Sequence, residues 1–135
     1  MSFLDRLQPL GLLVLRLVLG AIMIAHGWQK IAGHMHGIMG FLSHLGIPPW
    51  MGYLVVAAEF GGGILVVVGF LTRFAAFAIL IDMLVAILKV HLHNGLTGQG
   101  GFEFPLALAA IAFSLIFSGA GAISLDWMRG SKGAR

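Results

Sequence analysis

Three ionisable residues, Arg16, Glu59 and Asp82, each lie inside a separate hydrophobic run of this chain. A charge in hydrocarbon costs at least ~2.5–3.5 kcal/mol on insertion scales, so such residues are rare and face a partner or a cavity. A guanidinium carries five donors in a fixed fork, so one arginine can bridge two carboxylates. We therefore expect Arg16 to contact one or both acids. The cluster would transfer protons at a catalytic site or lock the helix order, and the sequence leaves both roles open.

A second set of reactive side chains lies near the other ends of these runs, beside two glycine-rich loops. The set predicts a substrate-binding site and consists of His26, Trp28, Lys30, Lys89, His91, His93 and Glu103. Histidine exchanges a proton near neutral pH, which suits an anionic or quinone-like ligand. The alternative is a set of ordinary interfacial side chains, with Trp28 in an aromatic belt. A metal site is not expected, because no cysteine or sequence-adjacent acid accompanies the histidines.

Helical spacing decides which of these residues share a face. Arg16 and Lys30 lie on one face of the first run, and Gly20 and Gly27 lie between them at helical steps. Small residues on that face permit close helix approach. The residues that share a face of the third run are Asp82, Lys89 and His93.

The composition indicates that membrane helices hold these residues. Of the 135 residues, 59% are hydrophobic and 10% are charged, and the mean hydropathy is +1.01, far from the values of a soluble domain. A stretch of about 20 apolar residues crosses a bilayer as an α-helix. We expect one all-α domain over residues 1–135, an antiparallel bundle of four transmembrane helices. The predicted spans cover residues 10–27, 50–70, 74–90 and 104–123.

The basic residues set the expected orientation. The eight Lys and Arg residues stand singly at helix ends, so the net charge of +3 does not predict nucleic-acid binding. With four spans, both termini and a tight turn at Thr72-Arg73 fall on one side of the membrane, and that side carries most of the basic residues. By the positive-inside rule, we expect both termini in the cytoplasm.

The chain contains no cysteine, which limits its redox chemistry. Disulfides, thiolate nucleophiles, thiolate zinc sites and iron–sulfur ligation are excluded within this chain. The sequence has no haem, flavin or metal motif. Any electron transfer must then run directly from a donor to a quinone, or through a partner protein.

Several spaced motifs resemble the signature of the DoxX-like membrane proteins. They are Leu15-Arg16-Leu17-Val18-Leu19-Gly20, His26-Gly27-Trp28-Gln29-Lys30, Ala58-Glu59-Phe60-Gly61-Gly62-Gly63, Gly69-Phe70-Leu71-Thr72-Arg73, His91-Leu92-His93-Asn94-Gly95, Gly101-Phe102-Glu103-Phe104-Pro105 and Ser124-Leu125-Asp126. The resemblance covers nearly the whole chain. It implies a four-helix bacterial inner-membrane protein, in a family that includes DoxD, the membrane subunit of a thiosulfate:quinone oxidoreductase.

Three functions follow as expectations. The first is the membrane subunit of an oxidoreductase system that binds quinone or a small sulfur-compound electron donor at its outer mouth. The second is a non-catalytic anchor or assembly factor, and the third is a small-solute or proton-conducting protein. Membrane lipid is an expected partner, while a soluble or membrane oxidoreductase partner and a homo-oligomer are left open. An outward-facing cavity would favour the first function, a packed core the second and a continuous polar path the third.

Overall fold

The computed structural model describes residues 2–132, and it contains no β-strand within them. In chain order the helices are α1 (Ser2–Asp5), α2 (Gln8–Ala32), α3 (Met35–His44), η1 (Pro49–Met51), α4 (Gly52–Val56), η2 (Ala57–Gly61), α5 (Gly62–Val68), α6 (Thr72–Ala86), η3 (Ile87–His91), η4 (Leu92–Asn94), α7 (Glu103–Ser118) and α8 (Leu125–Lys132). Two of them, η2 and η3, are wide π-helical turns, and η1 and η4 are short 3₁₀ turns. The prediction of an all-α protein is confirmed.

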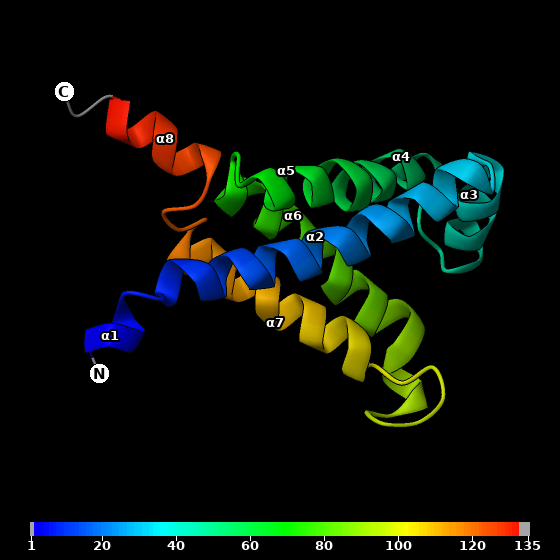
Figure 1. The fold of residues 1–135 in the computed structure, drawn as a ribbon. Helices are drawn as coiled ribbons and strands as arrows, with labels where there is room; N and C mark the ends of the chain where they lie inside the picture. Colours follow the sequence, from blue (N-terminus) through cyan, green and yellow to red (C-terminus); the bar gives the residue numbers. More distant parts are fainter. Residues whose placement is uncertain (1, 133–135) are drawn as a thin grey trace.

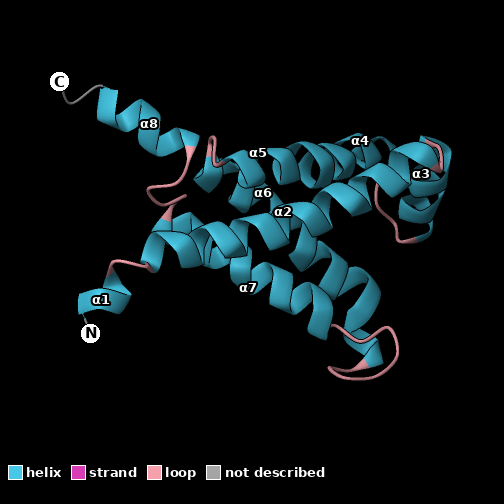
Figure 2. Ribbon diagram, viewed as in Figure 1, coloured by secondary structure: helices cyan, strands magenta, loops and turns pink. Residues whose placement is uncertain are grey.

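Three continuous helices are long and apolar enough to cross a membrane. They cover Gln8–Ala32, Pro49–Val68 and Thr72–Asn94, and a shorter apolar helix covers Glu103–Ser118. The second runs through η1, α4, η2 and α5, and the third runs through α6, η3 and η4. Successive helices run in opposite directions, so the four make the antiparallel bundle that the sequence predicts (Figure 1, Figure 2).

The bundle is built from two helix pairs, α2 with η2 and α5, and α6 with α7. Glycines bring the backbones of the first pair together. A Cβ atom at Gly63 would lie 2.9 Å from the carbonyl oxygen of Gly20, and one at Gly27 would lie 2.6 Å from the backbone nitrogen of Phe60. A methyl group does not fit at either position, so these glycines fix how closely α2 packs on its neighbour.

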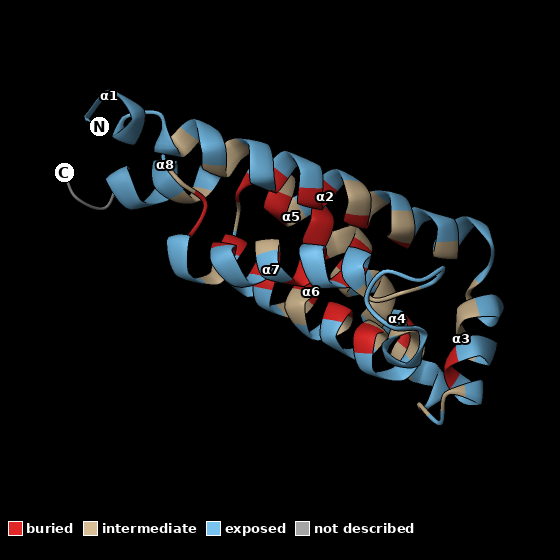
Figure 3. Ribbon diagram, turned by 90° about the horizontal axis from the view of Figure 1, so that it is seen from below, coloured by how far each residue is buried: buried red, intermediate tan, exposed pale blue. Residues whose placement is uncertain are grey.

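An apolar core lies midway along the bundle (Figure 3). Each of the four helices of the bundle contributes a fully buried side chain to it, namely Leu19, Val66, Ile79 and Leu115. Many large side chains on the outside of the bundle, such as Phe74 and Phe117, are apolar and exposed. An apolar exterior around a bundle whose backbone groups bond within helices is what a bilayer requires.

The two ends of the bundle carry different elements (Figure 1). We call one the termini end, which holds α1, the turn between α5 and α6, segment 119–124 and α8. We call the other the loop end, which holds α3, η3, η4 and the loop at 95–102. The polar residues of the sequence divide between these ends, and the apolar core separates them.

At the loop end the helices extend beyond the predicted spans, since the first ends at Ala32 and the third at Asn94, not near residues 27 and 90. Two boundaries at the termini end also differ, and for these the backbone gives the reason. The last long helix ends at Ser118, not near residue 123, because Gly119 and Gly121 have φ angles of 71° and 79° that a helix cannot contain. The turn between the second and third spans is earlier than predicted, since Gly69 ends α5 in the left-handed conformation and Thr72 already begins α6. Both departures occur at the termini end. There, carbonyls near the end of α5 and in segment 119–124 accept hydrogen bonds from the buried Arg16.

Candidate functional site

A cavity of about 530 Å³ lies inside the loop end of the bundle. Its walls come from α2, α3, the second long helix, α6, η3 and α7. Most of the wall is apolar, with Ile38, Phe41 and Leu42 of α3 closing one side. Seven of its remaining lining residues can carry charge or a proton, namely His26, Lys30, Glu59, Asp82, Lys89, His91 and Glu103.

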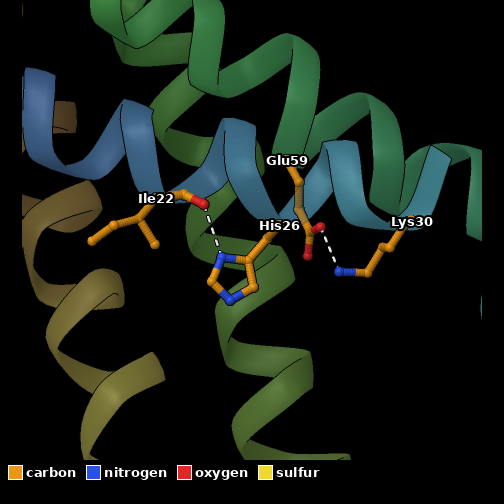
Figure 4. A network of polar contacts seen from close by, with 4 residues as sticks. All are labelled: Ile22, His26, Lys30 and Glu59. Atoms are coloured by element: carbon orange, nitrogen blue, oxygen red, sulfur yellow. Dashed lines mark hydrogen bonds and ion pairs between the residues drawn. The ribbon is translucent and has the colours of Figure 1, made fainter. Parts of the chain in front are cut away.

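The innermost polar contact in the cavity is an ion pair between α2 and η2. Nζ of Lys30 donates to Oε2 of Glu59 at 2.6 Å, and the Glu59 side chain is 6% exposed while that of Lys30 is 24% exposed (Figure 4). Glu59 occupies the middle of the π-helical turn η2. Such turns are frequent at functional sites, because the extra residue changes the direction in which a side chain leaves the helix.

Asp82 of α6 lines the same cavity and interacts electrostatically with both members of this pair. Its Oδ2 atom is buried and accepts no hydrogen bond from residues 2–132. Two carboxyl groups beside one ammonium group give the cluster a charge of −1 when all three ionise, and one shared proton would neutralise it. A buried acceptor without a donor is costly, so this oxygen requires a proton shared with Glu59 or a donor from a ligand or a water molecule.

His26 points into the cavity from α2 with one ring nitrogen already engaged. Its Nδ1 lies 2.8 Å from the carbonyl oxygen of Ile22, one turn earlier, so Nδ1 carries the proton and donates (Figure 4). The Nε2 atom is then the free nitrogen, an acceptor in the neutral ring and a donor in the charged one. The ring packs near Phe104 of α7, at 6.0 Å between centroids.

His91 is held in the same way on the other side of the cavity. Its Nδ1 lies 2.7 Å from the carbonyl oxygen of Gly100, which also accepts a bond from the side chain of Asn94 at 3.0 Å. These two bonds tie loop 95–102 to the end of the third span. The cavity therefore has two lining histidines, His26 and His91, whose Nδ1 atoms are bonded to backbone carbonyls and whose Nε2 atoms are free of bonds to residues 2–132.

The other predicted substrate-site residues divide into two groups. Lys89 and Glu103 line the cavity and are exposed at its edge. Trp28 and His93 lie outside it, and both are exposed. The Trp28 ring packs on Phe60 at 6.3 Å between centroids. The prediction that one face of the third span brings His93 into the site is wrong, because the π-helical turn η3 shifts the register between Lys89 and His93.

Arg16 does not join the carboxylates, and this corrects the cluster predicted from the sequence. Its guanidinium is 1% exposed at the termini end, where it donates to four backbone carbonyls. The acceptors are Val66 at 2.9 Å, Val67 at 2.9 Å, Ala120 at 2.8 Å and Ile123 at 2.7 Å. Val66 lies seven residues after Glu59, which places the two sites about 10 Å apart along that helix. Arg16 therefore bonds carbonyls in the last turn of α5 and carbonyls of segment 119–124, and so joins these two parts of the chain.

Asp126 is the partner residue at this end that sequence reasoning missed. Its two carboxylate oxygens accept the backbone N–H groups of Leu71 and Thr72 at 2.8 and 2.9 Å, so it caps α6 from α8. Burial raises the pKa of Asp126, but the hydrogen bonds from Thr72 and Leu71 outweigh this effect, and the pKa is lowered from its ordinary value. The motif Ser124-Leu125-Asp126 carried the only signal, since a serine before a helix suggests a cap.

The fold and the cavity define a small multi-pass helical membrane protein with a polar site at one end. Comparison with known proteins then gives the family. The DoxX family model matches residues 11–92, so the chain belongs to the DoxX family. No solved structure matches the chain.

Curated relatives match over most of their length. The chain is 33% identical over 117 residues to a Bacillus subtilis protein named "Putative oxidoreductase CatD", covering 87% of this chain and 85% of that one. It is 32% identical over 129 residues to the inner membrane protein YqjF of Escherichia coli, covering 94% and 98%. An uncharacterized protein of Haemophilus influenzae is 34% identical over 136 residues, covering 93% and 96%.

Proposed function

We propose that this protein is the membrane subunit of an oxidoreductase system and binds quinone, or a small sulfur-compound electron donor, in the loop-end cavity. The observation that carries the proposal is the arrangement of that cavity, in which apolar walls surround Lys30, Glu59 and Asp82. The name of the Bacillus subtilis relative supports the reaction class. The name of the Escherichia coli relative supports an inner-membrane location. With the basic termini end in the cytoplasm, the cavity would face outward.

The size and lining of the cavity suit an uncharged ring better than a small anion. A volume of about 530 Å³ falls in the range of sites that bury a drug-sized ligand. The cavity has three acidic and two basic lining residues, so its charge does not attract an anionic ligand. Of the two ligand classes, a quinone therefore fits this cavity better than an anionic sulfur compound does.

The lining can also supply the protons that quinone chemistry needs. Reducing a quinone to its quinol consumes two electrons and two protons, and this cysteine-free chain has no redox group of its own. The electrons would come from the donor or from a partner protein. The protons would pass through the Nε2 atoms of His26 and His91 and through the Glu59–Asp82 pair, because these groups face the cavity and can exchange a proton.

The two other functions have less support. Conduction needs a polar path between the two ends, but Leu19, Ile79 and Leu115 are fully buried between them and lie in an apolar core. A simple anchor has no need for a cavity with a buried carboxylate oxygen that accepts no bond from residues 2–132. A buried polar group that costs stability is better explained by a ligand.

Binding of a water-soluble short-chain quinone to the purified full-length protein in lipid nanodiscs tests the proposal. We expect saturable binding in the wild type and at least about tenfold weaker binding in Glu59→Gln and His26→Ala, which each lose one polar contact worth ~1.4 kcal/mol or more. His36→Ala is the matched control, since His36 is exposed on α3 and does not line the cavity. Thiosulfate serves as the second probe. If quinone does not bind, or binds equally to all variants, the proposal is wrong.

A further inference from the structure

A second, larger cavity lies at the termini end, and the proposed function does not use it. It has a volume of about 870 Å³ and lies between the start of α6, the end of α7 and α8. Its lining includes Arg73, Phe74, Gly119, Asp126 and Trp127. It is separated from the loop-end cavity by the apolar core.

The positively charged group of this cavity is the guanidinium of Arg73. It lies against the bare backbone of Gly119, where a Cβ atom would come within 3.3 Å of its Nε and Nη2 atoms. No carboxylate within residues 2–132 forms an ion pair with it. Asp126 also lines the cavity, but its two oxygens already accept the N–H groups of Leu71 and Thr72. Arg73 therefore has all five of its N–H donors available to a ligand within the described part of the chain.

Basic residues outnumber acidic ones across the whole termini end. Within residues 2–132, the basic residues of this end other than buried Arg16 are Arg6, Arg73, Arg129 and Lys132, and the acidic ones are Asp5 and Asp126. The guanidinium of Arg129 lies over the ring of Phe70, at 5.1 Å from its centroid. A cluster of basic residues next to the ends of membrane spans attracts anionic lipid headgroups, at roughly 1 kcal/mol for each basic residue.

Large apolar side chains flank this charged group. Phe74 is 72% exposed and Trp127 is 60% exposed, and both line the cavity. On the neighbouring surface of α7, Phe113 and Phe117 pack together at 4.9 Å and are also exposed. A guanidinium beside exposed aromatic rings at a membrane boundary offers a phosphate contact and an acyl-chain contact within one cavity.

We propose that the termini-end cavity binds an anionic phospholipid, with Arg73 donating to its phosphate group and Phe74 and Trp127 contacting its chains. This site is independent of the ligand at the loop end. Because α8 contributes one wall, the bound lipid would hold α8 against the ends of α6 and α7.

Lipid retention measured by native mass spectrometry tests this site on the full chain. The purified protein is titrated with phosphatidylglycerol, with phosphatidylcholine and with inorganic phosphate. We expect phosphatidylglycerol to bind best, and Arg73→Gln to weaken it about fivefold, the equivalent of one basic residue. The matched control is Arg6→Gln, because Arg6 is exposed at the same end and does not line the cavity. The loss in that control should be clearly smaller than in Arg73→Gln, because Arg6 adds only to the general positive charge of this end and not to the cavity.

A second variant keeps the test decisive if Arg73→Gln does not fold. Gly130 lines the cavity, and a Cβ atom there meets nothing within 4 Å, so Gly130→Asp adds a negative charge without a clash. It should weaken phosphatidylglycerol binding and leave phosphatidylcholine binding unchanged. Three results would overturn the proposal: equal binding of the two lipids, unchanged binding in both cavity variants, or inorganic phosphate binding as tightly as the anionic lipid.

Discussion

Arg16 and Lys30 stand on the same helix, about 21 Å apart at 1.5 Å per residue, and their surroundings differ in kind. Arg16 donates four hydrogen bonds to backbone carbonyls and is almost completely buried. Lys30 pairs with one carboxylate at the edge of a cavity that contains a second carboxylate with an unbonded buried oxygen. The buried guanidinium at the termini end is thus bonded by the fold, whereas the charged cluster at the loop end includes a buried carboxylate oxygen that no donor within residues 2–132 reaches. Intramembrane charge alone does not distinguish a structural residue from a functional one; the number of satisfied hydrogen bonds does.

Removing the Arg16 side chain tests the structural half of this comparison and should have the largest effect. In Arg16→Leu, four backbone carbonyls lose a charged donor, and each such bond contributes ~1.5–3 kcal/mol. We expect a loss of at least about 3 kcal/mol in the free energy of unfolding, measured by reversible unfolding in mixed micelles. Arg16→Lys should recover part of it, since a lysine has three donors. Full stability of Arg16→Leu would show that the termini end does not depend on this residue.

Substitution of the acids in the cavity should lower activity and change stability little. Glu59→Gln and Asp82→Asn keep the shape of the side chain but lose its capacity to exchange a proton, a contribution typically of 10²–10⁴-fold in rate. We expect a drop of about 10²-fold in quinone-linked turnover with the native donor system. The free energy of unfolding should change by less than about 2 kcal/mol, since the Lys30 side chain keeps contact with water. A variant that loses stability and keeps turnover would assign these acids to the fold.

A smaller effect should come from the cap that joins α8 to α6. Asp126→Ala removes the acceptor of two backbone N–H groups, which should cost ~0.5–2 kcal/mol. The pKa of Asp126 is lowered in the folded protein, so its stabilisation is present above the unfolded value of about 3.9 and is lost as the pH falls through the folded value. Unfolding measured between pH 7 and pH 3 should therefore show a steeper acid-side decline in the wild type than in Asp126→Ala. Parallel curves for the two proteins would contradict the cap.

The smallest expected effect separates two neighbouring histidines. His91 lines the cavity and bonds to the Gly100 carbonyl, whereas His93 is exposed outside it. We expect His91→Ala to weaken quinone binding several-fold and His93→Ala to leave it unchanged within error. Equal losses for both variants, measured by the same nanodisc titration, would mean that the loop end has a different arrangement in the bilayer.

The sequence predicted the helical membrane fold because hydropathy and loop signals are local. It also placed His26, Lys30, Lys89, His91 and Glu103 at one end, and the cavity contains all five. The sequence could not identify the hydrogen-bond partners of Arg16, because pairing by charge assumes that carboxylates are the best acceptors for a guanidinium. The actual acceptors are two carbonyls in the last turn of α5 and two in segment 119–124, and a backbone carbonyl has no signature in the residue types.

The loop-end part of the site was harder to predict for a related reason. The π-helical turns η2 and η3 each insert one residue into a helical register, so facing rules based on 3.6 residues per turn fail beyond them. His93 was lost from the predicted face in this way. The apolar wall made by Phe41 and Leu42 was not predicted either. The sequence indicates a short interfacial helix at residues 38–42, which lies within α3, but not that this helix lines the cavity.

Mapping where a photoreactive quinone attaches to the protein decides between the two ends of the bundle. The full-length protein in nanodiscs would be labelled, digested and sequenced by mass spectrometry, with unlabelled quinone as competitor. We predict competed labels on peptides that contain His26, Glu59 or Asp82, and a loss of those labels in Glu59→Gln. Labels confined to peptides around Arg16, Arg73 or α8, or labels that unlabelled quinone does not reduce, would contradict the assignment of the loop-end cavity as the ligand site.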